Sequence, residues 1–198
     1  NRRNAMTQLG NGLQDAQRCQ DALSVLEADL ATERRIGTPE EDLLITRTNL
    51  ALCLSQLGRN AESLRMRREV FADSSRLNSP DDDDTIISAH HLSESLIHAK
   101  LFKEARTLLR KNIRVARRTR ENGNEVVLDL RTTYVRAIYR DTNSSRSDVH
   151  EAVAISEDIV RTARRVFGTE HPYFAGYQAD LESARMRLAD DESREANA

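Results

Sequence analysis

The sequence has no tryptophan and few residues of the kinds that make turns or cross-links. Its 198 residues include 3 prolines, 7 glycines and 2 cysteines, and aromatic residues make up 4% of the chain. A β-sandwich or β-barrel needs a turn about every ten residues, which so little Gly and Pro does not support. The cysteines, Cys19 and Cys53, form no CxxC pair, and this favours a reducing, cytoplasmic setting.

Long apolar runs and a dominant charge are also missing. No segment approaches the roughly 20 apolar residues of a membrane span, and the N-terminus lacks the apolar core of a signal peptide, so we expect no membrane partner. Thirty Lys and Arg against 32 Asp and Glu leave a net charge of −2, so no overall field attracts nucleic acid. Charged residues still make up 31% of the chain, a composition typical of helices. Because the sequence does not begin with Met, we expect it to be part of a longer protein.

A repeat runs through the whole chain. One large apolar position recurs at Leu9, Leu50, Leu92, Tyr134 and Leu181. The first three spacings are 41, 42 and 42 residues, and the last is 47 because five extra residues fall in the polar segment 141–147. Each copy holds two stretches of helical periodicity with a short break between them, which predicts a helix pair.

We therefore expect about nine helices in an all-α fold. Their predicted ranges are 2–16, 19–35, 40–57, 60–77, 81–99, 102–120, 124–140, 147–167 and 172–189. Thr38 begins a predicted capping box with Pro39 at the first helical position, and the aspartates 81–84 place negative charge at the start of the next helix. A metal site or an exposed turn is the alternative for the aspartates. Helix pairs this small bury their apolar faces only by stacking, so the pairs form a solenoid.

Several segments carry a resemblance to a known family. The run Asn49-Leu50-Ala51, the turn Gly58-Arg59 and the stretch 164–172, which reads RRVFGTEHP, resemble the long 42-residue tetratricopeptide repeats (TPR) of kinesin light chains. Where that family has a small residue at the crossing of its two helices, this chain has Ala22, Ser63, Ala105 and Ala152. Lys100 departs from the pattern, since it replaces the turn glycine of the third copy.

The resemblance implies a right-handed α-solenoid of about four helix pairs plus one extra helix. We expect one domain at 1–190, with repeats at 2–37, 38–78, 79–121 and 122–168, a final helix at 171–190 and a frayed tail at 191–198. It implies a non-catalytic protein-protein interaction scaffold, without a cofactor, that binds a peptide in its concave groove. The alternative is a sensor segment of a larger STAND-type nucleotide-binding signalling protein. The array ends lack polar caps and could stack on another copy.

The groove positions of the family carry over to a set of residues on the first helix of each pair. The predicted peptide-binding residues are Thr48, Asn49, Leu52, Gln56, His90, His91, Glu94, His98, Thr133, Arg136, Arg140 and Arg187, with Thr7, Gln8, Asn11 and Gln14 on the first helix. Asn49 is the strongest candidate, because an amide can donate to and accept from an extended backbone at once. The alternative is that Asn49 caps or bridges helices.

Two clusters within this set suggest a more specific chemistry. Arg136, Arg140 and Arg187 could form a cationic end for an acidic segment or a C-terminal carboxylate. The alternative is pairing with Asp129, Asp180 or Glu182 inside the array. His90, Glu94 and His98 could be the metal ligands of a metal-dependent enzyme. A straight helix does not bring all three side chains to one metal ion, so we predict no metal site. These histidines are better explained as polar groove residues, and a pH-sensitive contact is compatible with them.

Signals for other functions are weak. The basic run 110–120 lies on a second helix without interleaved aromatic residues, so it is better explained as a solvated surface than as a nucleic-acid site. The sequence contains no GxSxG, P-loop or GxGxxG motif. We therefore predict no catalytic residues.

Overall fold

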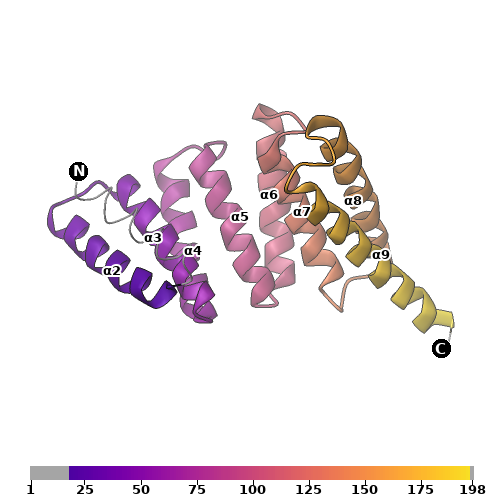
Figure 1. Ribbon diagram of the computed structural model, residues 1–198, viewed down its shortest axis with the longest axis horizontal. Helices are drawn as coiled ribbons and strands as arrows, with labels where there is room; N and C mark the ends of the chain where they lie inside the picture. Colours follow the sequence, from indigo (N-terminus) through magenta and orange to yellow (C-terminus); the bar gives the residue numbers. More distant parts are fainter. Residues whose placement is uncertain (1–17, 197–198) are drawn as a thin grey trace. The chain divides into compact units, whose positions relative to one another are not determined.

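The structure, a computed structural model, describes residues 18–196, which form eight α-helices (Figure 1). They are α2 Cys19–Arg35, α3 Glu40–Gln56, α4 Asn60–Leu77, α5 Asp83–His98, α6 Phe102–Thr119, α7 Glu125–Tyr139, α8 Arg146–Val166 and α9 Phe174–Ala196. The helix expected at 2–16 lies outside the described residues, and the other eight are confirmed. The frayed tail is corrected in part, because α9 continues past residue 190 to Ala196. Within the described residues, no helix is long and apolar enough to cross a membrane.

The chain divides into two compact units. Unit 1 is Asn1–Ala99 and holds α2 to α5, whereas unit 2 is Lys100–Ala198 and holds α6 to α9. Within each unit, helices that follow one another in the chain pack side by side, and α7 also packs against α9 (Figure 1). This pairing of consecutive helices is the solenoid arrangement predicted from the repeat. The single superhelical domain at 1–190 stays a prediction.

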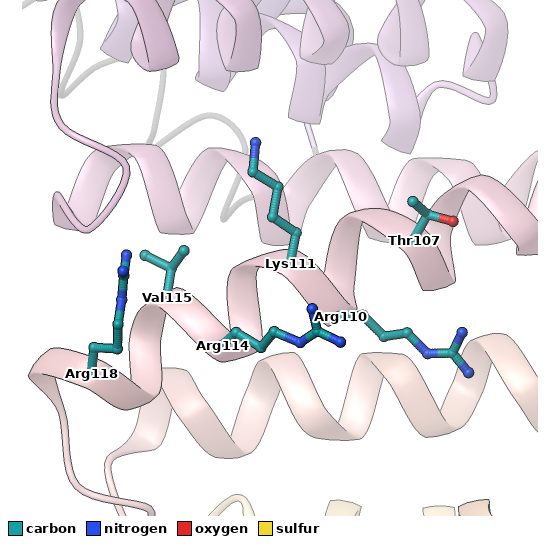
Figure 2. Close-up of a pocket in the computed structure, with 6 residues that line it drawn as sticks. All are labelled: Thr107, Arg110, Lys111, Arg114, Val115 and Arg118. Carbon is teal, nitrogen blue, oxygen red and sulfur yellow. The ribbon is translucent and has the colours of Figure 1, made fainter.

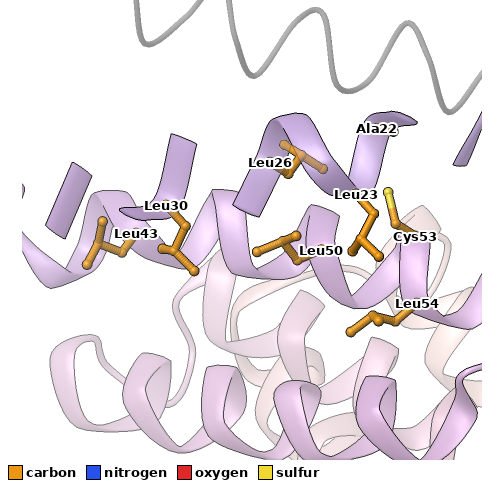
Figure 3. Close-up of a cluster of buried hydrophobic side chains, with 8 residues drawn as sticks. All are labelled: Ala22, Leu23, Leu26, Leu30, Leu43, Leu50, Cys53 and Leu54. Carbon is orange, nitrogen blue, oxygen red and sulfur yellow. The ribbon is translucent and has the colours of Figure 1, made fainter. Parts of the chain in front are cut away.

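The core of unit 1 lies between α2 and α3. Figure 3 shows its side chains, which are Ala22, Leu23, Leu26, Leu30, Leu43, Leu50, Cys53 and Leu54. Leu23, Leu26 and Leu30 on α2 recur at three- and four-residue steps, as do Leu50, Cys53 and Leu54 on α3. Each helix therefore turns one apolar stripe toward its neighbour. Leu26 is 0% exposed and Leu50 is 2% exposed. Burying a leucine side chain contributes about 1.5–3 kcal/mol, so a few such residues hold this helix pair together.

Small residues mark the helix crossings, as the resemblance implied. Ala22, Ala105 and Ala152 are 0% exposed and Ser63 is 1% exposed. The Ser63 hydroxyl donates a hydrogen bond of 2.7 Å to the carbonyl oxygen of Ala51, so this buried polar group is satisfied across the crossing of α3 and α4.

Unit 2 has a core with more aromatic content. Leu128, Ile159 and Ala163 pack with Phe174 and Tyr177, each of these residues being at most 4% exposed.

The loop between α7 and α8, which was expected to be a polar insertion, is partly buried and fixed in place. The Arg106 guanidinium donates to Asp141 Oδ2 at 2.9 Å and to Ser144 Oγ at 3.1 Å. The five extra residues therefore form an anchored connection.

The helix starts confirm one expectation and correct another. Asp82 caps α5, because its side chain accepts a hydrogen bond of 2.9 Å from the backbone N–H of Asp84. The capping box at Thr38 is wrong: α3 begins at Glu40 after Pro39, and no side chain caps it. Ser145 and Asp148 form a capping box on α8 that the sequence analysis did not identify.

Candidate peptide-binding hollow

A hollow of about 370 Å³ opens in unit 1 between α3 and α5, and α4 contributes its floor. We call it the unit 1 hollow. Its lining consists of Glu41, Asp42, Leu44, Ile45, Thr48 and Asn49 from α3, Val70 and Ser74 from α4, and Asp84, Ile87, Ser88 and His91 from α5. Thr48, Asn49 and His91 are the predicted groove residues that the hollow brings together.

Helical spacing explains why these side chains share one surface. On α3, Glu41, Ile45 and Asn49 follow one another at four-residue steps, and on α5 Asp84, Ile87 and His91 do so at steps of three and four. Residues at these spacings lie on one face of a helix. The two facing helices therefore carry similar series, with a carboxylate first, an isoleucine next and a polar group last.

The lining is acidic at the starts of α3 and α5 and apolar one turn further along both helices. Glu41, Asp42 and Asp84 lie in the first turns of α3 and α5, where the positive end of the helix dipole stabilises carboxylates. Ile45 is 61% exposed and Ile87 is 40% exposed, although both side chains are large and apolar. None of the described residues that line the hollow is Lys or Arg.

A buried arginine fixes α3 against α4 beside the hollow. Arg47 is 6% exposed, and its guanidinium donates to Asp73 Oδ2 at 2.7 Å and to Glu40 Oε1 at 3.0 Å. The hydrogen bond from Arg47 is the main reason why the pKa of Asp73 is lowered. Arg47 thus holds the acidic start of α3 without placing its own charge in the hollow.

His91 is held in its neutral form. Burial is the main reason why its pKa falls from 6.5 to about 4, and the positive charge of Arg67 and the neighbouring His90 lower it further. The Arg67 guanidinium also donates a hydrogen bond of 2.6 Å to the carbonyl oxygen of His91. This environment favours a neutral His91 near pH 7.

Two neighbouring predicted residues on α3 line the hollow. The Thr48 hydroxyl donates to the carbonyl oxygen of Leu44 at 2.8 Å, so its hydrogen is used within the helix. Asn49 is half-buried on the wall of the hollow.

The other predicted residues of unit 1 do not line the hollow. Leu52 is 40% exposed on α3, and the side-chain oxygen of Gln56 accepts a hydrogen bond of 3.0 Å from Cys19. On α5, Glu94 lies 3.9 Å from the Arg67 guanidinium and His98 is exposed. His90 stands beside His91, with ring centroids 6.0 Å apart. Residues 7 to 14 of the predicted groove lie outside the described residues.

In unit 2 the predicted cationic end is largely paired internally. Arg136 makes a two-pronged contact with Asp180, with Nε 2.9 Å from Oδ1 and Nη2 2.7 Å from Oδ2, and the Tyr139 hydroxyl donates to Asp180 at 2.9 Å. The pairing of Arg136 with Asp180 within the array, which was the alternative interpretation, is the one observed. Arg187 bonds to Asp191 and to the carbonyl oxygen of Asp141.

Two further predicted residues of unit 2 differ sharply in exposure. Thr133 is 1% exposed, so it offers a ligand no surface in this structure. Arg140 is exposed, with its guanidinium 5.9 Å from the ring centre of Tyr139. A buried Tyr177, which donates to Asp129 at 3.0 Å, lies on α9 against the α7 face. Side chains of α9 therefore contact this side of α7.

No metal centre is formed by the described residues. Among them, no group of three or more His, Cys, Asp or Glu side chains is arranged to hold a metal ion.

Nine of the twelve residues that line the hollow were not predicted from the sequence, among them three carboxylates and two isoleucines. The three carboxylates and the two isoleucines lie one or two turns before the family's groove positions, so carrying over those positions did not reach them. A signal was present, because Ile45 and Ile87 are separated by the same 42 residues as Leu50 and Leu92. An apolar residue that repeats on the exposed side of successive helices indicates a shared surface.

Comparison with known proteins gives the family. A sequence model of the tetratricopeptide repeat matches residues 42–118, and a second model of the same repeat matches residues 142–173. Together they cover more than half of the chain. The chain belongs to the tetratricopeptide repeat family. No curated protein matches the sequence.

Solved structures agree on the fold of this TPR chain. Two crystal structures of the nearly identical TPR-like repeats of a kinesin light chain from Podosopora anserina are each 21% identical, with TM-scores of 0.80 and 0.79. Each match covers 98% of this chain and 90% of the other. BtubC (BKLC) from P. vanneervenii is 14% identical with a TM-score of 0.77, over 96% of this chain and 74% of the other. The suspected kinesin-light-chain-like TPR array is thus confirmed as a fold.

The family also bears on the kind of function. TPR arrays are generally protein-protein interaction scaffolds without catalytic activity, and the fold of this chain is of that kind. The fold itself names no partner.

Proposed function

We propose that this TPR chain binds an extended protein segment in the unit 1 hollow, and that the segment carries basic and apolar side chains. The observation that carries the proposal is the composition of the lining. Three carboxylates and two exposed isoleucines line the hollow together with Asn49, and no described lining residue is Lys or Arg.

Each part of the lining supports a different contact. The Asn49 amide is suited to the backbone of an extended segment, because it can donate to a carbonyl and accept from an N–H. Ile45 and Ile87 gain about 25 cal/mol for each Å² of apolar surface that a ligand covers. Glu41 and Asp84 attract a Lys or Arg side chain and repel a carboxylate, so they contribute specificity as well as affinity.

The proposal is tested with short fluorescent peptides of defined composition. Two peptides share the same apolar residues and differ in having Lys or Glu at the flanking positions, and binding to the whole chain is followed by fluorescence anisotropy. We expect saturable binding of the Lys peptide and at least about tenfold weaker binding of the Glu peptide, which corresponds to about 1.4 kcal/mol.

Neutralising the hollow tests the origin of that preference. The double variant Glu41→Gln with Asp84→Asn should weaken the Lys peptide and leave the Glu peptide unchanged. Glu27→Gln is the matched control, because Glu27 is an exposed carboxylate on α2 that does not line the hollow. Equal binding of both peptides, or an equal loss with the control, contradicts the proposal.

A reducing, cytoplasmic setting is part of the proposal. Cys19 and Cys53 are both thiols, and Cys53 is buried in the core of unit 1. Thiols persist where the glutathione and thioredoxin systems keep cysteine reduced. Fractionation of the source cells with an antibody to the chain tests this: recovery from the secreted fraction alone contradicts it.

A further inference from the structure

The basic run on α6 forms walls of two hollows in unit 2. Figure 2 shows the first, of about 510 Å³, with Lys111 pointing away from the side of α6 along which Arg110 and Arg114 extend. The second measures about 290 Å³ and is lined from three helices. From α6 come Arg110, Ile113, Arg114 and Arg117, from α7 come Arg131 and Tyr134, and from α8 come Glu151 and Ile155. We call the second one the arginine hollow.

One end of the arginine hollow is held in place by an aromatic contact. The Arg110 guanidinium donates to the Tyr134 hydroxyl at 2.8 Å and lies 5.3 Å from the centre of that ring. Tyr134 is 3% exposed, so its ring forms a firm wall that presents no surface for stacking a base. Arg110 therefore contributes charge to the hollow from a fixed position.

The deepest arginine has an unsatisfied donor. Arg131 is 6% exposed, and its Nη2 donates to Asp158 Oδ2 at 2.7 Å. Its Nη1 is buried and has no hydrogen-bond partner among the described residues. A buried N–H without a partner typically costs about 1–3 kcal/mol, and more in a charged group. A ligand atom that accepts from Nη1 would recover this energy.

The charge around the hollow is not balanced. Four arginines line it, whereas Glu151 is its one carboxylate among the described residues and Asp158 pairs with Arg131. The pKa of Arg117 is lowered, mainly by partial desolvation of its otherwise exposed side chain and then by the charge of Arg131, with Asp158 opposing. Two positive charges are therefore in excess, at the end of the hollow away from Tyr134.

We propose that the arginine hollow is a binding site for a phosphate group, with Arg114, Arg117 and the unpaired Nη1 of Arg131 as its donors. A phosphate monoester carries a charge of about −1.5 to −2 at pH 7, which matches the excess. Guanidinium groups bind phosphate oxygens through paired N–H donors. Arg114 and Arg117 are exposed and their long side chains can close over a bound anion. This site is separate from the unit 1 hollow.

Calorimetric titration of the whole chain with inorganic phosphate tests the proposal, with chloride adjusted to keep the ionic strength constant. We expect saturable binding that is at least about tenfold weaker in the double variant Arg114→Gln with Arg117→Gln. Arg118→Gln is the control, because Arg118 lies on the same helix and does not line the arginine hollow. No saturable binding above chloride, or an equal loss with Arg118→Gln, overturns the proposal.

A variant that is expected to strengthen phosphate binding controls for loss of folding, because a misfolded variant would bind more weakly. Glu151→Gln removes the carboxylate that repels phosphate, so it should tighten binding, whereas Glu157→Gln on the same helix should not. Weaker or unchanged binding in Glu151→Gln overturns the proposal. A parallel titration with a phosphoserine peptide separates the sources of the anion: tighter binding than phosphate assigns the site to a phosphorylated partner, and equal binding assigns it to the free ion.

Discussion

The neutral state of His91 makes a quantitative prediction about stability and pH. Its pKa is about 4 in the folded chain, whereas an exposed histidine has 6.5. Between these values the unfolded chain binds a proton that the folded chain does not, so this residue lowers the free energy of unfolding as the pH falls from 6.5 to 4. Above 6.5 both states are neutral, and the contribution is constant.

The size of the effect follows from the difference in pKa. One pKa unit corresponds to 1.36 kcal/mol, so the pKa of about 4 in the folded chain makes the loss about 3 kcal/mol at pH 4 relative to pH 7. Urea unfolding at a series of pH values measures it. In His91→Gln this part of the loss should disappear, whereas His98→Gln, at an exposed histidine of the same helix, should keep it. Identical pH profiles for the original chain and His91→Gln would refute the reasoning, as would an NMR titration midpoint for His91 near 6.5.

The remaining predictions concern core packing, two turns and the ion pair between Arg136 and Asp180. Each is tested by the free energy of unfolding in urea. Leu26→Ala should lower the free energy of unfolding by about 2–5 kcal/mol, because the side chain is 0% exposed in the core; a loss below about 1 kcal/mol contradicts that packing. Gly58 has φ of 75° and Lys100 has φ of 59°, a backbone conformation that favours glycine. Gly58→Ala should therefore lower the free energy of unfolding by about 1 kcal/mol, and Lys100→Gly should raise it by a similar amount. A change of the same sign in both variants contradicts this prediction. Asp180→Asn should cost about 1.5–3 kcal/mol by weakening the contact with Arg136, and no change refutes its structural role.

The helices could be predicted from the sequence because their signal is local and repeated. Leu50 and Leu92 recur at a fixed spacing, and small residues such as Ser63 mark each crossing. The helix ends were harder to predict. Thr38 has the sequence of a capping box, yet the chain enters α3 through Pro39 and the cap is not made. Whether a cap forms depends on the path of the preceding turn, which a motif does not determine.

The candidate site could be predicted only in part. The family positions led to Thr48, Asn49 and His91, because a helical register carries over from one repeat to the next. The role of Arg136 depends on Asp180, which lies on a different helix and is 7% exposed. Charge pairing between helices is a property of the packed structure, so a sequence pattern cannot decide between an internal pair and a ligand contact.

The pKa of His91 illustrates the same limit. Histidine type and spacing predict a group that titrates near neutral pH. Burial and the nearby charge of Arg67, which comes from α4, lower its pKa to about 4. Both causes arise only once α4 and α5 are packed together, so the sequence pattern alone does not predict the lowered pKa.

Site-specific crosslinking tests the central claim, that the unit 1 hollow is the peptide-binding site. The photoreactive residue p-benzoylphenylalanine replaces Ile87 inside the hollow, or Ile36, which is 67% exposed and does not line it. Each variant is irradiated with the Lys peptide, and the products are identified by mass spectrometry. The account predicts a crosslink from position 87 that an excess of unlabelled peptide removes, and none from position 36. Equal crosslinking at both positions, or none at position 87 while the peptide binds, would contradict it.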